Sequence, residues 1–118
     1  MKYRIEHDLI GEFEVPAEAL YGVHTARSAV NFPLTGRRVH PAWIHAMGDV
    51  KLACARTSRA LGAWKDNPKK ADAIENACLE FAQGKLDDAV IVDPLQGGAG
   101  TSLNMNTSEV IANRALEL

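Results

Sequence analysis

The sequence has few cysteines, no long apolar run and no excess of basic residues, and each scarcity excludes a class of protein. Its 118 residues include two cysteines, Cys54 and Cys78, without the spacing of a metal or redox motif. No apolar stretch approaches the roughly 18 residues of a membrane span, and the N-terminus lacks the apolar core of a signal peptide. With 13 basic against 15 acidic residues, no electrostatic footprint for nucleic acid is present. We therefore predict a cytoplasmic protein that binds neither nucleic acid nor membrane.

The remaining composition, 47% hydrophobic and 24% charged, is that of one globular domain. Short apolar segments on either side of Gly11 predict an extended arm or a short hairpin that ends at Pro16. Residues 21–40 contain Gly22, Pro33 and Gly36 and show no sustained period, which predicts irregular structure. The first third of the chain is therefore expected to be an irregular arm.

Two helices are predicted to follow as an antiparallel hairpin joined by residues 62–66. The first helix begins at Pro41, and residues of its predicted stripe recur at alternating steps of four and three. This spacing predicts a buried face made of Trp43, Met47, Val50, Cys54, Thr57 and Leu61. The second begins at Asn67 and Pro68, and its predicted buried stripe is Ala71, Ile74, Cys78 and Phe81. The cations Lys51, Arg56 and Arg59 are assigned to a solvated face.

A short apolar segment at residues 89–92 predicts a buried extended stretch, and residues 104–118 predict a final helix. The final helix carries three asparagines, Asn104, Asn106 and Asn113, which is unusual because asparagine is a poor helix former. We expect their amides to tie down the glycine-rich loop before the helix or to face a polar cleft. The apolar pattern is still running at Leu118, which predicts that the chain is cut from a longer one.

The glycine-rich residues 97–102 (GGAGTS) carry the clearest chemical signal. A loop of this kind at the start of a helix gathers backbone N–H groups at one point, which suits an anion. The spacing fits neither a P-loop, because Thr101 follows Gly100, nor a dinucleotide fingerprint, because position 103 is Leu103. A plain glycine turn with Ser102 or Thr101 as the helix N-cap is the alternative.

Other polar residues give weaker signals. His24 fits a structural or surface role better than a catalytic one. His40 and His45 have no carboxylate at ligand spacing, so no zinc site is predicted. Arg27 suits a structural ion pair first and a substrate carboxylate second.

Three blocks of the sequence resemble the aspartase/fumarase superfamily. Residues 96–106 (QGGAGTSLNMN) with 109–115 (EVIANRA) resemble the first conserved block of that superfamily, and residues 4–8 (RIEHD) resemble its opening. Residues 20–27 (LYGVHTAR) are similar to the ammonia-lyase branch rather than to the fumarases. Leu103 and Ser108 depart from the usual pattern without touching the Gly-Ala-Gly-Thr core.

The resemblance implies a mainly α fold, with residues 1–118 as the N-terminal domain, truncated before the central helical bundle. It implies a homotetramer whose active sites combine three subunits, while the fragment alone is expected to self-associate. Thr101 matches the threonine that binds a substrate carboxylate, and Gly100, Ser102 and Asn104 complete the expected substrate-binding set. The catalytic serine loop of the superfamily is absent from these residues, so no catalytic residue is assigned, and no metal or cofactor is expected.

The implied activity is the reversible deamination of L-aspartate to fumarate and ammonia, with a small dicarboxylate as the partner. Two alternatives stay open: a relative of fumarate hydratase, and a non-catalytic interaction module that keeps the lyase fold. The 118-residue chain alone is expected to be inactive, because it offers an anion-binding loop without a general base at readable spacing.

Overall fold

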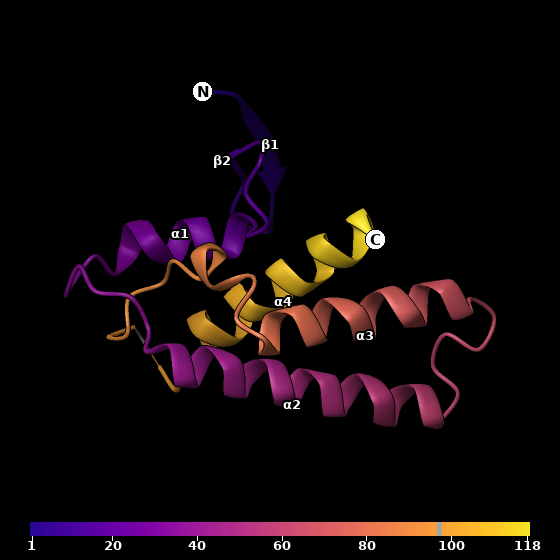
Figure 1. Cartoon of the computed structure of the whole chain (residues 1–118). Helices are drawn as coiled ribbons and strands as arrows, with labels where there is room; N and C mark the ends of the chain where they lie inside the picture. The colour runs from indigo at the N-terminus through magenta and orange to yellow at the C-terminus, as the bar shows by residue number, and fades with distance from the viewer. Residues whose placement is uncertain (97) are drawn as a thin grey trace.

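A layered helical body with a two-stranded hairpin projecting from it makes up the structure (Figure 1). It is a computed structural model that describes residues 1–96 and 98–118. In chain order the elements are β1 (Tyr3–His7), β2 (Glu12–Pro16), α1 (Val23–Asn31), α2 (Pro41–Ala60), α3 (Pro68–Ala82), the 3₁₀ turn η1 (Asp87–Ala89) and α4 (Thr101–Glu117). The predicted mainly α fold is confirmed.

The predicted hairpin is present. Strands β1 and β2 pair antiparallel in a register that places Tyr3 opposite Pro16. The side chain of Asp8 closes the turn by accepting hydrogen bonds from the N–H groups of Ile10 and Gly11, at 2.9 and 3.1 Å. Gly11 has φ of 139°, which favours glycine at this point of the turn.

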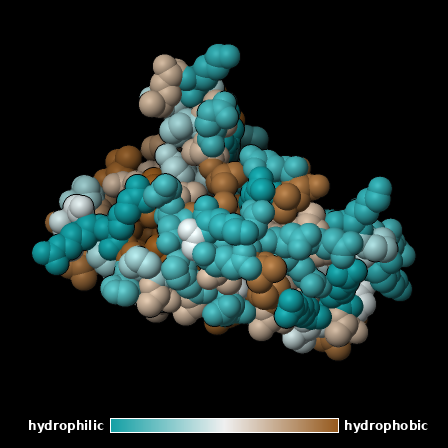
Figure 2. All heavy atoms as spheres, viewed as in Figure 1, coloured by the Kyte–Doolittle hydropathy of each residue, from teal (hydrophilic) through white to brown (hydrophobic). Residues whose placement is uncertain are grey.

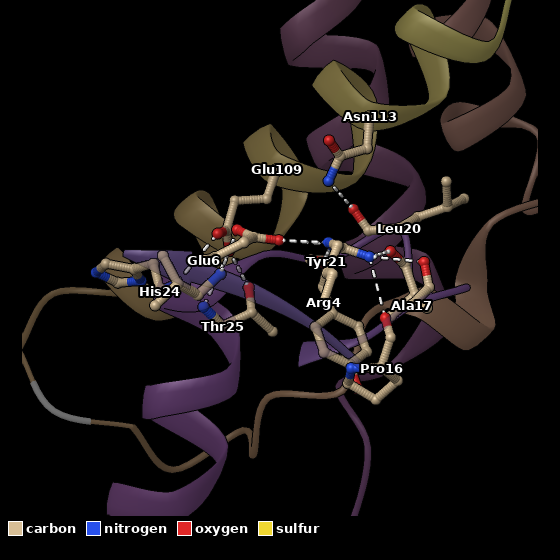
Figure 3. A network of polar contacts seen from close by, with 12 residues as sticks. Arg4, Glu6, Pro16, Ala17, Leu20, Tyr21, His24, Thr25, Glu109 and Asn113 are labelled. Carbon is tan, nitrogen blue, oxygen red and sulfur yellow. Dashed lines mark hydrogen bonds and ion pairs between the residues drawn. The ribbon is translucent and has the colours of Figure 1, made fainter. Parts of the chain in front are cut away.

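Helix α1 corrects the prediction that residues 21–40 are irregular. Its N-terminus has no cap in its own sequence, since Gly22 supplies no side chain. Two distant carboxylates accept its first N–H groups instead: Glu6 bonds Val23 at 3.1 Å, and Glu109 of α4 bonds the next two residues (Figure 3). A Cβ at Gly22 would collide with the Glu109 carboxylate, so glycine is required there.

The Glu109 carboxylate makes three hydrogen bonds at this junction. It accepts from the N–H of His24 at 3.1 Å, from the N–H of Thr25 at 2.9 Å and from the Thr25 hydroxyl at 2.5 Å. Arg4 braces the second carboxylate: its guanidinium lies 2.7 Å from Glu6 and also donates to backbone carbonyls of the segment between β2 and α1 (Figure 3).

Helices α2 and α3 form the predicted hairpin and lie side by side (Figure 1). Their caps are local, because His40 Nδ1 accepts from Ala42 N–H at 3.1 Å and Asn67 Oδ1 accepts from Lys70 N–H at 3.1 Å. The predicted stripe of α3 is confirmed, with Ala71, Cys78 and Phe81 buried and Ile74 packed against the core.

The predicted buried face of α2 is wrong. Ile44, Gly48 and Ala55 are its buried residues. Of the predicted stripe, Met47 alone packs against the core, whereas Trp43, Val50, Cys54, Thr57 and Leu61 are exposed. The reason lies at Gly48, where an added Cβ would come within 2.5 Å of the Ala82 backbone of α3. The close crossing requires a glycine and thereby decides which face turns inward.

Exposed apolar side chains are scattered on the face seen in Figure 2, where hydrophilic side chains interrupt the brown patches. Among the exposed apolar residues of the chain is Leu61, just after α2, which is 85% exposed. Within residues 1–96 and 98–118, no helix combines the length and the apolar character of a membrane span.

Helix α4 packs against α3 and α1 and carries much of the core. Leu103 and Val110 are fully enclosed, and they join Phe81 of α3 in one apolar cluster. Arg114 of α4 pairs with Glu80 of α3 at 2.6 Å, and this ion pair lowers the pKa of Glu80 chiefly through the hydrogen bond. Helix α4 is therefore the element against which α1 and α3 are placed.

In the described residues the three amides of α4 bond neighbouring segments, and none bonds the glycine-rich loop that they were predicted to tie down. Asn106 is fully buried and bonds the segment at the end of η1 from both ends of its amide, accepting from Ile91 N–H at 3.0 Å and donating to the Ala89 carbonyl at 3.0 Å. Asn113 donates to the Leu20 carbonyl at 2.6 Å. Asn104 accepts from Lys51 of α2.

Replacing Glu109 with alanine is expected to lower the free energy of unfolding by about 2–3 kcal/mol, because three donors at the start of α1 lose a charged acceptor. Chemical denaturation measures the loss, and faster amide hydrogen exchange at His24 and Thr25 locates it. Glu117→Ala, which removes an exposed carboxylate of the same helix, is the matched control and is expected to change the stability by less than about 0.5 kcal/mol. Equal losses in the two variants would contradict the capping role.

Candidate functional site

The loop before α4 is anchored at its beginning by Asp93, whose side chain is almost fully buried. Its carboxylate accepts from the N–H groups of Thr35 and Gly36 at 2.7 and 3.1 Å, and from Leu95 N–H at 2.8 Å. Burial alone would raise the pKa of Asp93, but the hydrogen bonds from Leu95, Thr35 and Gly36 outweigh it and lower the pKa. The loop therefore starts from a fixed point.

Gln96 joins this anchor to the first turn of α4. Its amide nitrogen donates to the Asp93 carbonyl at 3.1 Å, and its amide oxygen accepts from Leu103 N–H at 2.5 Å. Leu103 N–H is one of the helix-start donors that lack a partner within the helix. A side chain seven residues away thus caps α4 from within the loop.

Gly100 is the N-cap residue of α4 and offers no side-chain cap. The predicted alternative, with Ser102 or Thr101 as the N-cap, is therefore wrong. Gly98 and Gly100 have φ of 77° and 86°, in the left-handed region that favours glycine. Gly97, the first residue of the predicted loop, lies outside the described residues.

The four residues predicted to bind substrate lie together at the start of α4. Thr101 is exposed and Ser102 is buried, so of these two hydroxyl-bearing residues only Thr101 is open to solvent. Ser102 N–H has no acceptor among the residues that the structure describes. Asn104 is half-buried, one turn further on. Thr101 and the N-terminal end of a 17-residue helix give this point donors and a partial positive charge.

A cleft of about 190 Å³ separates this helix start from α1. His24 and Ser28, one helical turn apart on α1, line one side, and Thr101 and Ser102 line the other. His24 Nδ1 and Ser28 Oγ are buried and have no hydrogen-bond partner among the described residues. Since buried polar groups are normally paired, these two atoms are unused hydrogen-bonding groups on residues of the α1 side of the cleft.

Arg27 also borders the cleft, but its guanidinium is engaged elsewhere. It bonds Asp8 at 2.8 Å and stacks 5.0 Å from the centroid of the Phe13 ring. The hydrogen bond from Arg27 is the largest cause that lowers the pKa of Asp8. The structural ion pair that the sequence favoured for Arg27 is confirmed.

The other histidines lie away from the cleft. His40 caps α2, and His45 pairs with Asp87 at 2.9 Å, a partner 42 residues away that spacing alone could not indicate. No group of three or more His, Cys, Asp or Glu side chains in the described part of the chain could hold a metal ion. The arrangement at α4 can bind an anion through hydroxyl and backbone donors.

Comparisons with known proteins decide the family. A sequence profile described as Lyase matches residues 11–118. An aspartate ammonia-lyase from a Bacillus species is 50% identical over 115 residues, which are 98% of this chain and 24% of that protein. The chain belongs to the fumarate lyase family.

Other members of the fumarate lyase family are equally similar. A class II fumarate hydratase from Mycobacterium tuberculosis is 50% identical over 113 residues, covering 96% of this chain and 23% of that protein. The crystal structure of a fumarate lyase:delta crystallin from Brucella melitensis superposes with a TM-score of 0.90 at 42% identity, covering 98% of this chain and 25% of that one. The chain spans about a quarter of the length of these relatives.

Sequence reasoning selected the glycine-rich loop as the candidate site but missed several residues that surround it. Lys51, assigned to a solvated face, bonds Asn104 at 2.7 Å. Ser28 lay in the segment predicted to be irregular, so nothing placed it near the loop. Gln96 stands at the edge of the glycine run, and no signal in the sequence indicated that its side chain bonds the first turn of α4.

Replacing Asp93 with asparagine is expected to destabilise the chain at neutral pH and to matter less in acid. A carboxyl whose pKa is lowered by folding adds stability above its unfolded pKa, and that stability is lost as the pH falls through the folded value. The difference between wild type and Asp93→Asn should therefore shrink below its ordinary pKa of 3.8. Denaturation at several pH values measures it.

Asp66→Asn, in the exposed connection between α2 and α3, is the control. It is expected to leave the stability unchanged at each pH, because an exposed single charge contributes little. A difference between wild type and Asp93→Asn that persists unchanged into acid would contradict the role assigned to the Asp93 carboxylate.

Proposed function

We propose that this chain is the N-terminal domain of a lyase that reversibly deaminates L-aspartate to fumarate and ammonia. Its part in that reaction is to bind a substrate carboxylate at the start of α4. The observation that carries the proposal is the exposed Thr101 at the N-terminal end of a long helix, beside a cleft. Gly100, Ser102 and Asn104 complete the binding set.

The chemistry explains why donors are useful at this point. Removing a proton next to a carboxylate moves negative charge onto the carboxylate oxygens in the transition state, and fixed donors aimed at those oxygens stabilise it. A hydroxyl and a helix N-terminus need little reorganisation to do this. The general base is proposed to come from another part of the whole protein, because no general base is assigned among the residues around the cleft.

Aspartate is preferred to malate as the substrate because of where one sequence block lies. Residues 20–27, which resemble the ammonia-lyase branch, enter α1 and supply His24 to the cleft wall. The segment with the ammonia-lyase character thus lies beside the proposed carboxylate site. Fumarate hydratase is the second candidate, supported by relatives of equal identity. A non-catalytic module is less favoured, since the loop and its cleft are both intact.

The whole protein is proposed to be a cytoplasmic homotetramer with composite active sites and no cofactor. The experiment that tests the function is to determine the coding sequence beyond Leu118, express the full-length protein, and assay three reactions. These are L-aspartate to fumarate, fumarate with ammonia, and fumarate hydration. Turnover of aspartate supports the proposal, hydration alone supports the second candidate, and no turnover supports the non-catalytic module.

Thr101→Val in the full-length enzyme is expected to lower kcat/KM by about 10- to 150-fold, because one hydrogen bond to a charged group contributes about 1.5–3 kcal/mol. Thr57→Val, the same exchange on the exposed side of α2, is the matched control and should keep the wild-type value. Steady-state kinetics with unchanged kcat/KM for Thr101→Val would contradict carboxylate binding at Thr101.

The 118-residue chain alone is expected to show no turnover of aspartate or fumarate. Binding a carboxylate equally in the ground and transition states does not accelerate the chemical step, and a general base contributes roughly 10²–10⁴-fold. Fumarate absorbance above a buffer control measures the reaction. Turnover that survives in a repeat preparation, and that Thr101→Val abolishes, would place a base within these residues.

A further inference from the structure

The cations of α2 point in two directions. Arg59 pairs with Asp72 and Glu75 of α3, at 2.9 and 3.1 Å, and so has carboxylate partners. Arg56 lies 3.7 Å from Glu75. Lys51 instead reaches α4, where its ammonium group donates to Asn104 Oδ1 at 2.7 Å. Lys51 and Asn104 are both half-buried.

The contact fixes the orientation of the Asn104 amide. A lysine ammonium group carries donors and no acceptor, so the amide can face it only with its oxygen. The amide nitrogen, with its two N–H groups, is then the end left for other partners. Asn104 is three residues after Thr101, and positions i and i+3 are neighbours on a helix surface. A donor is thus presented one turn from the proposed carboxylate site.

The positive charge of Lys51 has no carboxylate partner in the described part of the chain. Among the ion pairs of the described residues none includes Lys51, and its hydrogen-bond partner is a neutral amide. A partly buried charge is costly unless it is compensated. This positive charge adds to that of the α4 N-terminus. An anion bound at the loop would supply the missing compensation.

We propose that Lys51 is a positioning residue for a dicarboxylate bound at the start of α4. It holds Asn104 so that the amide N–H groups face the carboxylate, and its charge raises the affinity for the anion. The inference rests on the proposed function and adds to it a residue that acts through Asn104 rather than by touching the substrate. A contact that merely joined α2 to α4 would affect stability and leave substrate affinity unchanged.

Four variants of the full-length enzyme separate these two roles. Lys51→Met removes the charge and the donor at similar length, and Lys51→Arg keeps both. Asn104→Asp keeps the link to Lys51, now as an ion pair, but cancels the charge and turns carboxylate oxygens toward the substrate. Arg56→Met removes a more exposed cation of the same helix and is the matched control.

The KM for aspartate is expected to rise about tenfold in Lys51→Met. The variant loses one interaction of moderate strength, and such a loss lowers the affinity by about that factor. The kcat should change by less than about twofold, and the effect should shrink at high salt. Lys51→Arg should recover most of the affinity, and Arg56→Met should keep the wild-type KM. Asn104→Asp should raise KM while its unfolding midpoint stays at or above that of the wild type.

A wild-type KM in Asn104→Asp or in Lys51→Met would overturn the inference. Calorimetric binding of succinate, an unreactive dicarboxylate, separates this outcome from a failure of the proposed function. If the wild type shows no turnover but binds succinate more tightly than Lys51→Met does, the lyase assignment fails and the role of Lys51 stands. If the wild type shows no turnover and does not bind succinate either, both are overturned.

Discussion

The carboxylate of Glu109 is the contact on which the arrangement of the site depends. It extends from α4 to the N-terminal end of α1 and accepts three hydrogen bonds from His24 and Thr25. With Glu6 it replaces the cap that the sequence of α1 does not contain, and it requires Gly22 beside it. Because α1 is one wall of the cleft, this contact positions that wall against α4.

A second set of polar contacts holds the two ends of the glycine-rich loop. The Asp93 carboxylate accepts hydrogen bonds from backbone N–H groups before the loop. The Gln96 amide bonds both the Asp93 carbonyl and the N–H of Leu103. Polar groups in low-dielectric surroundings are costly when unpaired, so such fully used networks favour one conformation. Among the described residues, Ser28 Oγ lacks a hydrogen-bond partner and Lys51 lacks a carboxylate partner, so neither belongs to such a network.

Local signals were sufficient for part of the fold. The hairpin followed from residues around Gly11, and α3 followed from Asn67, Pro68 and its apolar period. Helix α1 was missed because its cap comes from Glu109, some 85 residues away. The buried face of α2 was predicted wrongly because periodicity finds apolar positions, whereas a close crossing at Gly48 decides which face meets α3.

The candidate site could be predicted from local signals, because residues 97–102 are contiguous in the sequence. The roles of Lys51 and Ser28 depend on how α2 and α1 pack on α4, and no periodic pattern contains that information.

One rigid helix serves the site twice, because α4 supplies Thr101 at its start and Glu109 two turns later. The two positions are eight residues apart, or about 12 Å along the axis. Both sides of the cleft are therefore positioned by the same helix. A shift of α4 along its axis moves Thr101 and the start of α1 together. Any motion of one wall relative to the other therefore has to change the contact between Glu109 and the first turn of α1.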